Sequence, residues 1–346
     1  MTIRGEGAIQ TDTAAPAAWI PGLVIRRYRG EDDIPEMVRI ANDAFVADGI
    51  PERQEFEELA SELRHPSDSF DASSDVLLAE VDGRVVAHGR AQWVDTTDGL
   101  REYRTGGTVD PEWRRRGIGR AVMHALVDRL RQVAASHDTD RPRVLGLWTN
   151  DCNPGAVALA ESEGFRPERW FFEMERRGIN GDLPEPPPMP EGLEIRSLSD
   201  DQAWPLWQAD MEAFQDHWGG FDGSEASFRR WVEAPHWDPS LCVVAWDGDE
   251  IAGGVINTVY ATENHELGIR RGWLDSVFTR RAWRKRGLAR ALIGRSLHLL
   301  AQRGLDTAAL GVDADNPSGA LGLYESFGFE VTLRGRAWRK PMEPAP

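Results

Sequence analysis

Hydrophobic and polar positions alternate along the chain in a pattern that occurs twice. Apolar residues spaced three and four apart indicate helices, and strict alternation indicates strands. Asp82-Gly83 separates two strands as in a tight β-hairpin, and Asp247-Gly248-Asp249 does the same in the second half. The expected opening elements of the first half are strand 23–28, helices 32–46 and 53–63, and strands 75–81 and 84–93; strands 241–246 and 250–260 flank the second hairpin.

Each half then continues in the same order. A further strand leads into a segment rich in arginine and glycine, and a long amphipathic helix follows it. A short apolar strand comes next, then a helix opened by Asn-Pro, and finally one more strand. The order predicts an α/β (α+β) domain with a mixed central sheet flanked by helices, present in tandem. The expected positions are 118–133 and 288–303 for the long helices, 144–149 and 308–312 for the apolar strands, and Pro154 and Pro317 for the helix starts.

Identical residues support the duplication. A shift of 170 residues carries Gly22–Arg26 onto Gly192–Arg196 and Trp113–Gly117 onto Trp283–Gly287. This period is far longer than that of a solenoid, so each copy is expected to have its own core. Prolines between the copies are typical of an extended spacer. The predicted division is a flexible tail over 1–20, an N-terminal domain over 21–177, a proline-rich linker over 178–191 and a C-terminal domain over 192–346.

Composition narrows the classes of function. The 346 residues carry 57 acidic side chains against 40 Lys and Arg, a formal net charge of −17, which repels nucleic acid and suits cationic substrates. The chain has no apolar run of about 18 residues and no apolar signal-peptide core, so we expect a cytoplasmic protein that does not bind membranes. Cys152 and Cys242 lack a CxxC or His cluster, so we expect two core cysteines and no metal.

Basic residues and glycines gather where a strand meets the long helix of each copy. These segments, Arg114–Ala121 and Arg284–Ala291, share the spacing RxxGx(G/A). Small residues let a ligand approach the backbone, and the helix N-terminus beyond them offers unpaired N–H groups to phosphate. A solvated turn would explain one such segment more easily than two at matching positions before amphipathic helices. The pattern therefore predicts a phosphate-binding turn in each copy, and its spacing differs from the GxGxxG of dinucleotide-binding folds.

With these motifs, both halves resemble the GNAT superfamily of acyl-CoA-dependent N-acetyltransferases, in the tandem two-domain arrangement of the mycothiol synthase type. The resemblance covers about residues 22–177 and 192–340. It implies that acetyl-CoA is the cosubstrate, with its diphosphate on the RxxGx(G/A) turn and its pantetheine arm along the preceding strand. The matching residues are Val277, Phe278, Thr279, Arg284, Lys285, Arg286, Gly287, Leu288, Ala289, Arg290 and Asn316 in the second copy, and Gly107, Thr108, Val109, Arg114, Arg115, Arg116, Gly117, Ile118, Gly119 and Arg120 in the first.

A second motif of the family distinguishes the two copies. The second copy has Asn316 after the apolar strand, Tyr324 on the next helix, and then Gly328-Phe329. Counting back four residues from the glycine of each Gly-Phe puts Ala160 of the first copy where Tyr324 stands. The resemblance implies that Tyr324 donates a proton to the departing thiolate; the alternative is a core aromatic residue. Asn316 similarly suits cofactor contact or helix capping. The first copy is expected to be catalytically degenerate.

The attacking amine must lose a proton, so the site needs a base. Asp275 lies just before the cofactor segment, at the same side-chain parity as Trp273 and Val277, and the family often places its acidic base on this strand. The first copy has Thr105 at this position. A solvated carboxylate without function is the alternative for Asp275. Rival bases are Glu263, His265 and Glu266 in the preceding loop, Asp313, and a chain of water molecules.

Residues 214–221 lie between the first two helices of the second copy, where the family has its acceptor pocket. Their aromatic and polar side chains suit a pocket wall or, equally, the packing between helices. We expect the second half to acetylate a primary amine of a small molecule by direct transfer, in a monomer or homodimer. Two other classes stay open: an acetyl-CoA sensor or scaffold, which has no use for Tyr324, and a protein or peptide N-acetyltransferase, which needs an open acidic groove.

Overall fold

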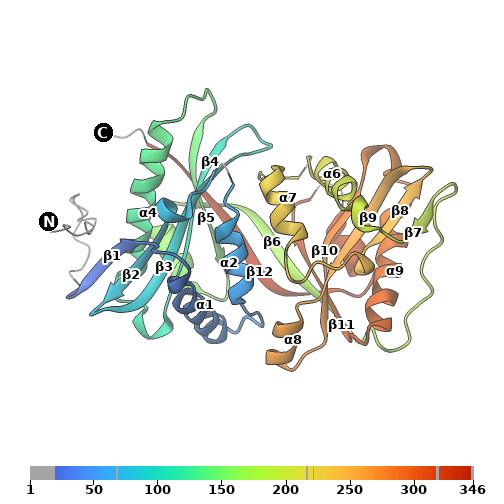
Figure 1. Ribbon diagram of the computed structural model, residues 1–346, viewed down its shortest axis with the longest axis horizontal. Helices are drawn as coiled ribbons and strands as arrows, with labels where there is room; N and C mark the ends of the chain where they lie inside the picture. Colours follow the sequence, from blue (N-terminus) through green and yellow to red (C-terminus); the bar gives the residue numbers. More distant parts are fainter. Residues whose placement is uncertain (1–19, 68, 216, 221, 317–318, 344–346) are drawn as a thin grey trace. The chain divides into compact units, whose positions relative to one another are not determined.

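The computed structural model describes residues 20–67, 69–215, 217–220, 222–316 and 319–343. The chain divides into two units (Figure 1). Unit 1 contains the chain up to Glu168 together with the segment from Ala337 onward, and unit 2 contains Arg169–Arg336. Nearly all of the predicted N-terminal tail lies outside the described residues.

Unit 1 has the element order that the sequence predicts, with one further short helix before the hairpin. Its strands follow the order β1-β2-β3-β4-β5, with the end of β12 beside β5. The pairs are antiparallel except for β4 with β5, which is parallel. The elements are β1 Leu23–Arg27, α1 Ile34–Asp48, α2 Phe56–Arg64, α3 Ala72–Asp75, β2 Val76–Val81, β3 Arg84–Asp95, β4 Arg101–Val109, α4 Ile118–Ala135, β5 Arg143–Asn150 and α5 Pro154–Ser162, followed by β6 Arg166–Arg177, which continues into unit 2.

Unit 2 repeats this order. Its strands run β6-β11-β10-β9-β8-β7, and β10 with β11 is again the parallel pair. The segment before β10, predicted to be a loop, forms a helix. The elements are β7 Glu194–Arg196, α6 Ala203–Phe214, α7 Glu225–Val232, β8 Val243–Asp247, β9 Glu250–Thr258, α8 Ala261–Leu267, β10 Arg271–Thr279, α9 Leu288–Gln302, β11 Thr307–Asp313, α10 Ala320–Glu325 and β12 Glu330–Pro341.

Each sheet is covered on both faces, and successive residues of one strand show this. In unit 1, Leu77 belongs to the cluster under α4 whereas Leu78 belongs to the cluster under α1 and α2. In unit 2, Val243 lies in the cluster under α9 and Val244 in the cluster under α6. The period-two alternation of the strands therefore builds two hydrophobic layers in each unit.

The hairpin turn between β2 and β3 has the predicted geometry. Asp82 and Gly83 both have positive φ angles, 51° and 83°. A two-residue hairpin turn of this hand requires left-handed backbone at both positions, which Asp tolerates and Gly adopts without strain. The Asp-Gly signal thus fixes where β2 ends and β3 begins.

The last strand of each copy completes the other unit. Residues 171–177 of β6 pair with β11 along its whole length, from Phe171 with Asp313 to Arg177 with Thr307. At the chain end, Trp338 donates from Nε1 to Thr149 Oγ1 over 2.8 Å in unit 1, where its side chain is fully buried. The units therefore differ from the predicted domains 21–177 and 192–346. The sequence pattern could not show this exchange, because an alternating strand fits either sheet equally well.

The proline-rich segment is part of unit 2 rather than a spacer. Arg295 and His298 of α9 donate to the carbonyl oxygens of Pro187 and Pro184, over 2.7 and 2.9 Å. A side chain at Gly294 would meet Pro187 at 2.9 Å, so the glycine permits this close packing. Ile179 is fully buried in the α9 cluster. The segment is extended, as its prolines predict, and it packs along α9.

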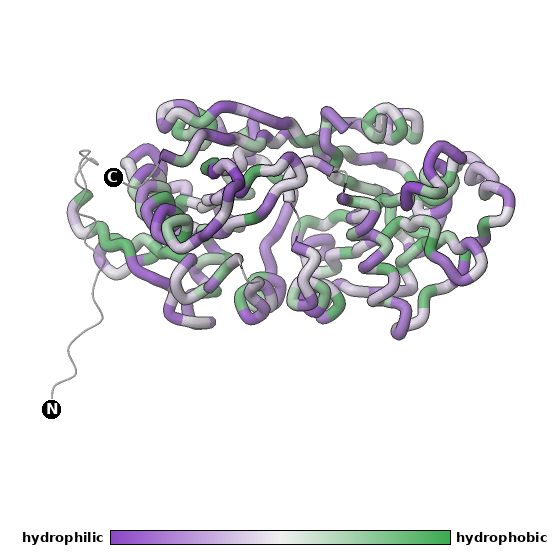
Figure 2. The backbone as a smooth tube through the Cα atoms, turned by 90° about the horizontal axis from the view of Figure 1, so that it is seen from above, coloured by the Kyte–Doolittle hydropathy of each residue, from purple (hydrophilic) through white to green (hydrophobic). Residues whose placement is uncertain are grey.

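Hydrophobic residues recur at intervals along the elements (Figure 2). Among the described residues, no helix is long and apolar enough to cross a membrane, and no group of three His, Cys, Asp or Glu side chains is arranged to hold a metal ion. Cys242 is buried as expected, and its surroundings raise the pKa of its thiol to about 12. The prediction for Cys152 is wrong, because this side chain is exposed next to the start of α5.

Candidate active site

The two arginine- and glycine-rich turns have the same backbone conformation. Arg115 and Lys285 both adopt left-handed φ angles, 64° and 62°. Two residues later, Gly117 and Gly287 do so again, at 90° and 82°, and cap the N-termini of α4 and α9. A non-glycine residue in this region is uncommon and marks a functional or strained turn. Its occurrence at matching positions shows that the two turns share one backbone conformation.

The turn in unit 2 presents backbone donors to a ligand. The N-cap residue of α9 is Gly287, which has no side chain to cap the first turn. Its first internal hydrogen bond runs from Ala291 N–H to Gly287 O, so the N–H groups of the residues between them lie at the open end of the helix. A Cβ atom at Gly287 would meet nothing within 4 Å, which leaves the backbone accessible. Open backbone N–H groups at a helix N-terminus suit an anion such as phosphate.

The first arginine of each turn has a structural role that the sequence did not reveal. Arg284 donates from Nε to Thr279 O and from Nη2 to Ala213 O, both over 3.0 Å. Arg114 donates to Val109 O in the same way and pairs through two nitrogens with Asp48. These contacts tie the turn to the strand before it and to the end of α1 or α6. The guanidinium groups thus position the turn, whereas we expected them to contact the phosphates.

The other basic side chains of the turns differ in their contacts. Arg116 donates to Glu112 O, Arg286 donates to Glu191 O, and Arg120 forms an ion pair with Glu163. Arg290 lies over the ring of Phe327 at 5.6 Å. Arg115 and Lys285, the two residues with left-handed backbone, have exposed side chains. In unit 2, Lys285 and Arg290 are therefore the side chains best placed to add positive charge at the turn.

The parallel strands beside each turn separate before they end. Pairing of β10 with β11 stops after Trp273 with Ala309, although β10 continues to Thr279 and β11 to Asp313. Pairing of β4 with β5 likewise stops after Arg104 with Gly146. The diverging strands leave backbone donors and acceptors without a ladder partner, and an extended ligand can pair there as an added strand does.

The three residues expected along the pantetheine arm form one side of this opening. Val277 packs against the α9 cluster, and Phe278 is buried in the α6 cluster. Thr279 ends the strand, and its hydroxyl is buried without a partner among the described residues. In unit 1 the matching segment ends at Val109, and Gly107 approaches the neighbouring strand so closely that a Cβ would meet His88 O at 2.6 Å.

Asp275 lies at an irregularity in β10. Leu274 pairs with Asn257 and Ser276 with Ile256, so Asp275 is an extra residue without a partner on β9, a β-bulge. Leu274 and Val277 are three positions apart, and in a regular strand they would lie on opposite faces, yet both pack with the α9 cluster. The prediction that Trp273, Asp275 and Val277 share one face is therefore wrong. In unit 1, Thr105 pairs regularly with Ala91, and β4 has no bulge.

The surroundings of Asp275 alter its acidity. The side chain is accessible to solvent, yet closely surrounding protein atoms raise its pKa to about 6, a shift that Glu263 adds to and a hydrogen bond with Thr258 opposes. Desolvation, which disfavours the charged form of a carboxyl group, is the largest cause of this upward shift. At neutral pH such a group is still mostly ionised, and it takes up a proton more readily than an ordinary aspartate.

Two of the rival bases are held by arginines. Glu263 is buried, and Arg271 donates to its Oε1 over 2.8 Å while also pairing with Glu175 of β6. Asp313 pairs with Arg169 over 2.8 Å and is almost fully buried. A carboxylate that balances a buried arginine is costly to protonate. His265 and Glu266 are exposed on α8, whereas Asp275 lies on β10 itself, where the pairing with β11 has ended, so Asp275 is the candidate base carried by the diverging strand.

Tyr324 lies on α10, where the sequence motif puts it. Its side chain is 7% exposed and belongs to the α9 cluster, which also contains Leu274. Burial raises the pKa of its phenol to about 12, and the ring of Phe329 meets it edge-on at 6.0 Å. Ala160 occupies the matching place in unit 1: the N–H of Phe165 donates to its carbonyl as that of Phe329 does to Tyr324.

The two asparagines differ. Asn153 caps α5, its side chain accepting from Ala156 N over 2.9 Å, as predicted for an Asn-Pro helix start. Asn316 donates from its N–H to Asp313 O, and α10 begins only at Ala320, with Gly319 as its cap. The expected helix start at residues 317 and 318 lies outside the described residues. Among the residues that the structure describes, Asn316 therefore follows β11 and is not the N-cap residue of α10.

The expected acceptor segment 214–221 is described in part, without residues 216 and 221. Trp218 contacts Phe171 of β6 at 6.0 Å, and His217 contacts Phe214 at 4.2 Å. A larger aromatic group, which the sequence did not single out, joins α6 to α7 and the loop after it. Trp231 contacts Trp237 at 4.0 Å and Trp207 at 5.4 Å. The tryptophan spacing on the two helices was the available signal for this group.

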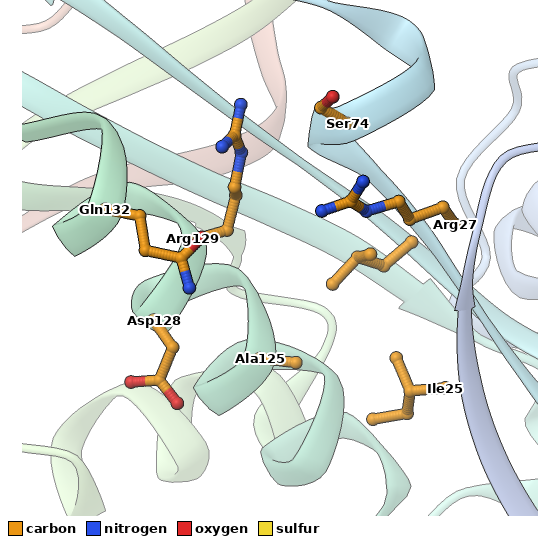
Figure 3. Close-up of a pocket in the computed structure, with 8 residues that line it drawn as sticks. Ile25, Arg27, Ser74, Ala125, Asp128, Arg129 and Gln132 are labelled. Atoms are coloured by element: carbon orange, nitrogen blue, oxygen red, sulfur yellow. The ribbon is translucent and has the colours of Figure 1, made fainter. Parts of the chain in front are cut away.

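A small recess opens elsewhere, between β1, β2 and α4 of unit 1 (Figure 3). None of the predicted site residues lines it. One of its arginines, Arg129, pairs with the buried Asp75 over 2.7 Å. The recess is lined by Ile25, Arg27, Ser74, Leu77, Ala125, Asp128, Arg129 and Gln132.

Comparison with known proteins agrees with this geometry. The model of the Acetyltransferase (GNAT) family matches residues 34–165 and again 204–329. The chain is 31% identical over 322 residues to the mycothiol acetyltransferase of Geodermatophilus obscurus, covering 89% of this chain and 94% of that one. It is 28% identical over 306 residues to the enzyme of the same name from Salinispora arenicola, covering 86% and 89%.

Solved structures show the same fold. A GCN5-related N-acetyltransferase from Sphaerobacter thermophilus superposes with a TM-score of 0.68 at 24% identity, covering 96% of this chain and 98% of that one. A tandem GNAT protein from the clavulanic acid biosynthesis pathway gives 0.67 at 18% identity, covering 94% and 99%. The two matched regions each contain one arginine- and glycine-rich turn and one pair of diverging strands. The chain belongs to the GNAT family of acetyltransferases, with one copy of the fold in each half.

Proposed function

We propose that the protein transfers the acetyl group of acetyl-CoA to a primary amine of a small molecule, and that unit 2 carries out the reaction. The observation that carries the proposal is the bulge of β10. It places an ionisable carboxylate where β10 and β11 diverge, and Tyr324 follows on the helix after β11. Unit 1 has regular pairing, Thr105 and Ala160 in the corresponding places.

The residues of unit 2 fit acetyl-CoA. The helix N-terminus behind Gly287 suits a diphosphate, with Lys285 and Arg290 as cations. The diverging strand from Val277 to Thr279 suits an extended amide-containing arm. Acetyl-CoA supplies an activated thioester carbonyl, and the protein has to orient it beside the amine and manage two protons.

Asp275 acts as the base for the incoming amine. Its carboxylate takes the proton from the amine nitrogen as the new C–N bond forms, and the C–S bond then breaks. The raised pKa of this carboxyl, about 6, brings it closer to the pKa of the amine while leaving it mostly ionised at neutral pH.

Tyr324 protonates the departing sulfur. Burial holds the pKa of its phenol near 12, so the group carries its proton throughout the working pH range. A thiolate leaves more easily when a donor is at hand. Asp275 and Tyr324 thus divide the two proton transfers, and neither role can be filled by Thr105 or Ala160 in unit 1.

The acceptor is proposed to be a small cationic molecule. The net charge of −17 attracts an ammonium-bearing substrate, and the two relatives described above bear the name mycothiol acetyltransferase. An amine precursor of the mycothiol type is therefore the first acceptor to test.

A coupled assay for free CoA thiol, with mass spectrometry of the product, tests the proposal. We expect amine-dependent turnover that Asp275→Asn lowers by about 100-fold or more. Acetyl-CoA binding without turnover on any small amine would favour a sensor or scaffold. Turnover on peptides alone would favour a protein N-acetyltransferase.

A further inference from the structure

A buried hydrogen bond joins α6 to the bulge of β10. Ser276, the residue directly after Asp275, donates from Oγ to Asp210 Oδ1 over 2.5 Å. The side chains are 66 positions apart in sequence and both are buried, Asp210 at 6% exposed and Ser276 at 9%. Asp210 has no part in the acetyl transfer described above. Burying a carboxylate costs free energy, so its presence at this position points to a role.

The bulge determines which way the neighbouring side chains point. If β10 paired regularly with β9 at Asp275, Leu274 and Ser276 would be two positions apart in a regular strand and would lie on the same face of β10. In the structure Leu274 lies with the α9 cluster and Ser276 reaches α6 on the other face. A hydrogen bond to Ser276 on the α6 face therefore favours the bulged register over the regular one, and with it the position of Asp275.

Unit 1 provides an internal comparison. Gly106 stands in the place of Ser276 and has no side chain to donate. The pairs Ala44-Phe45 of α1 and Ala213-Phe214 of α6 align the two helices. Three residues before the alanine of each pair, Asp210 of α6 corresponds to Ala41 of α1. Both partners are thus missing from the unit whose strand is regular. The donor, the acceptor and the bulge occur together in unit 2.

We propose that Asp210 is a positioning residue, which holds the β10 bulge through Ser276 and so keeps Asp275 at the point of β10 where the pairing with β11 has ended. This inference rests on the proposed role of Asp275 as the base. Asp210 touches no reacting atom. Its carboxylate accepts a hydrogen bond from the strand, and the strand carries the base.

A different role would use the same contact chemically. Ser276 could relay the proton of the amine to Asp210, which would then be the base in place of Asp275. The two roles make opposite demands on Asp210: positioning needs only an acceptor for the Ser276 hydroxyl, whereas a relay needs a group that takes up a proton. Asparagine meets the first demand and fails the second.

The experiment compares Asp210→Ala, Asp210→Asn, Ser276→Ala and Asp275→Asn in the full chain. Steady-state rates are measured with acetyl-CoA and an accepted amine between pH 5 and 9, and the unfolding temperature of each variant is recorded. We expect Asp210→Ala and Ser276→Ala to lower kcat about 10- to 100-fold, with KM for acetyl-CoA within about twofold, because only the position of the base is lost. Asp210→Asn should stay within about threefold of the wild type.

The pH profile separates positioning from a general loss of stability. In the wild type kcat/KM should rise through about pH 6, the pKa of Asp275. In Asp210→Ala this limb should move toward the ordinary value near 4, since a displaced Asp275 loses the surroundings that raise its pKa. Asp210→Asn should keep the wild-type limb.

Three results would overturn the inference. Asp210→Asn as inactive as Asp275→Asn would make Asp210 part of a proton relay. Asp210→Ala with a lower unfolding temperature but unchanged kcat and pH limb would reduce the contact to ordinary packing. The third result is a kcat of Ser276→Ala equal to that of the wild type. If Asp275→Asn itself were fully active, the proposed base would fail, a result distinct from the other three.

Discussion

Replacing Tyr324 by phenylalanine isolates the chemical role of its hydroxyl group. The ring is 7% exposed and packed in the α9 cluster, and phenylalanine fills the same space. Among the described residues the Tyr324 hydroxyl has no hydrogen-bond partner, so its removal leaves no buried group unsatisfied. The free energy of unfolding should therefore change by less than about 0.5 kcal/mol, a shift of no more than about 2 °C in Tm.

The effect on catalysis should be much larger. A general acid typically contributes a factor of about 10² to 10⁴. A loss of about 100-fold in kcat corresponds to about 2.7 kcal/mol of transition-state stabilisation. The KM for acetyl-CoA should stay within about twofold, because the diphosphate turn and the diverging strand are untouched. The assay is steady-state release of CoA thiol, with calorimetric titration of acetyl-CoA and thermal unfolding of the same preparation.

Tyr103→Phe is the matched control in unit 1. Tyr103 is fully buried, and its hydroxyl shares a hydrogen bond with His137 Nδ1 over 2.8 Å. Its loss should cost about 1 kcal/mol of stability and leave kcat unchanged. The two substitutions thus predict opposite patterns, stable but slow for Tyr324 and less stable but active for Tyr103. A Tyr324→Phe enzyme within threefold of the wild-type kcat would refute the assignment of the phenol as acid.

Four further predictions follow from single features. Gly287→Val should abolish calorimetric binding of acetyl-CoA to unit 2, while Gly304→Val, with a similar φ of 81° at the other end of α9, should only lower Tm. kcat/KM should rise with pH through about 6, and Asp275→Asn should remove this limb. Proteolytic cleavage of an engineered site within 181–190 should leave both fragments eluting together without denaturant, because each supplies a strand to the other unit. Burial raises the pKa of Asp210 to about 7, above its unfolded value near 3.9, so wild-type stability is lost as pH rises between these values; the Tm gain of Asp210→Asn should be larger at pH 8 than at pH 5.

The elements of the fold were predictable because local patterns determine them. The hairpin at Asp82-Gly83 follows from left-handed backbone that few residues adopt, and the helix cap at Asn153 follows from a side chain that accepts a hydrogen bond from the first turn of α5. The motif spacing also located both turns and put Tyr324 on α10. The exchange of β6 and β12 was not predictable, since it depends on which of two similar sheet edges a strand meets, and the prolines of the linker do not show that it packs along α9.

The chemistry of the site was predictable in kind more than in detail. Sequence put Asp275 on the correct strand, yet its parity argument failed because nothing local marks an extra residue in β10. Arg284 looks like a phosphate ligand in the motif, and only the tertiary structure shows its side chain bonded to Thr279 O and Ala213 O. Such contacts join residues that are far apart in the chain, and a motif read along the chain contains no information about them.

The difference between the two units separates binding from catalysis. Unit 1 retains the turn with left-handed Arg115 and Gly117 and the diverging strands, which are features of the backbone. It lacks the bulge of β10 and the counterparts of Asp275 and Tyr324, the two side chains proposed to move protons. If the two units had diverged by general decay, the demanding backbone of the turn would be lost as readily as two side chains, since left-handed arginine costs about 1 kcal/mol. We therefore propose that unit 1 still binds a ligand at this turn and that unit 2 alone catalyses the transfer.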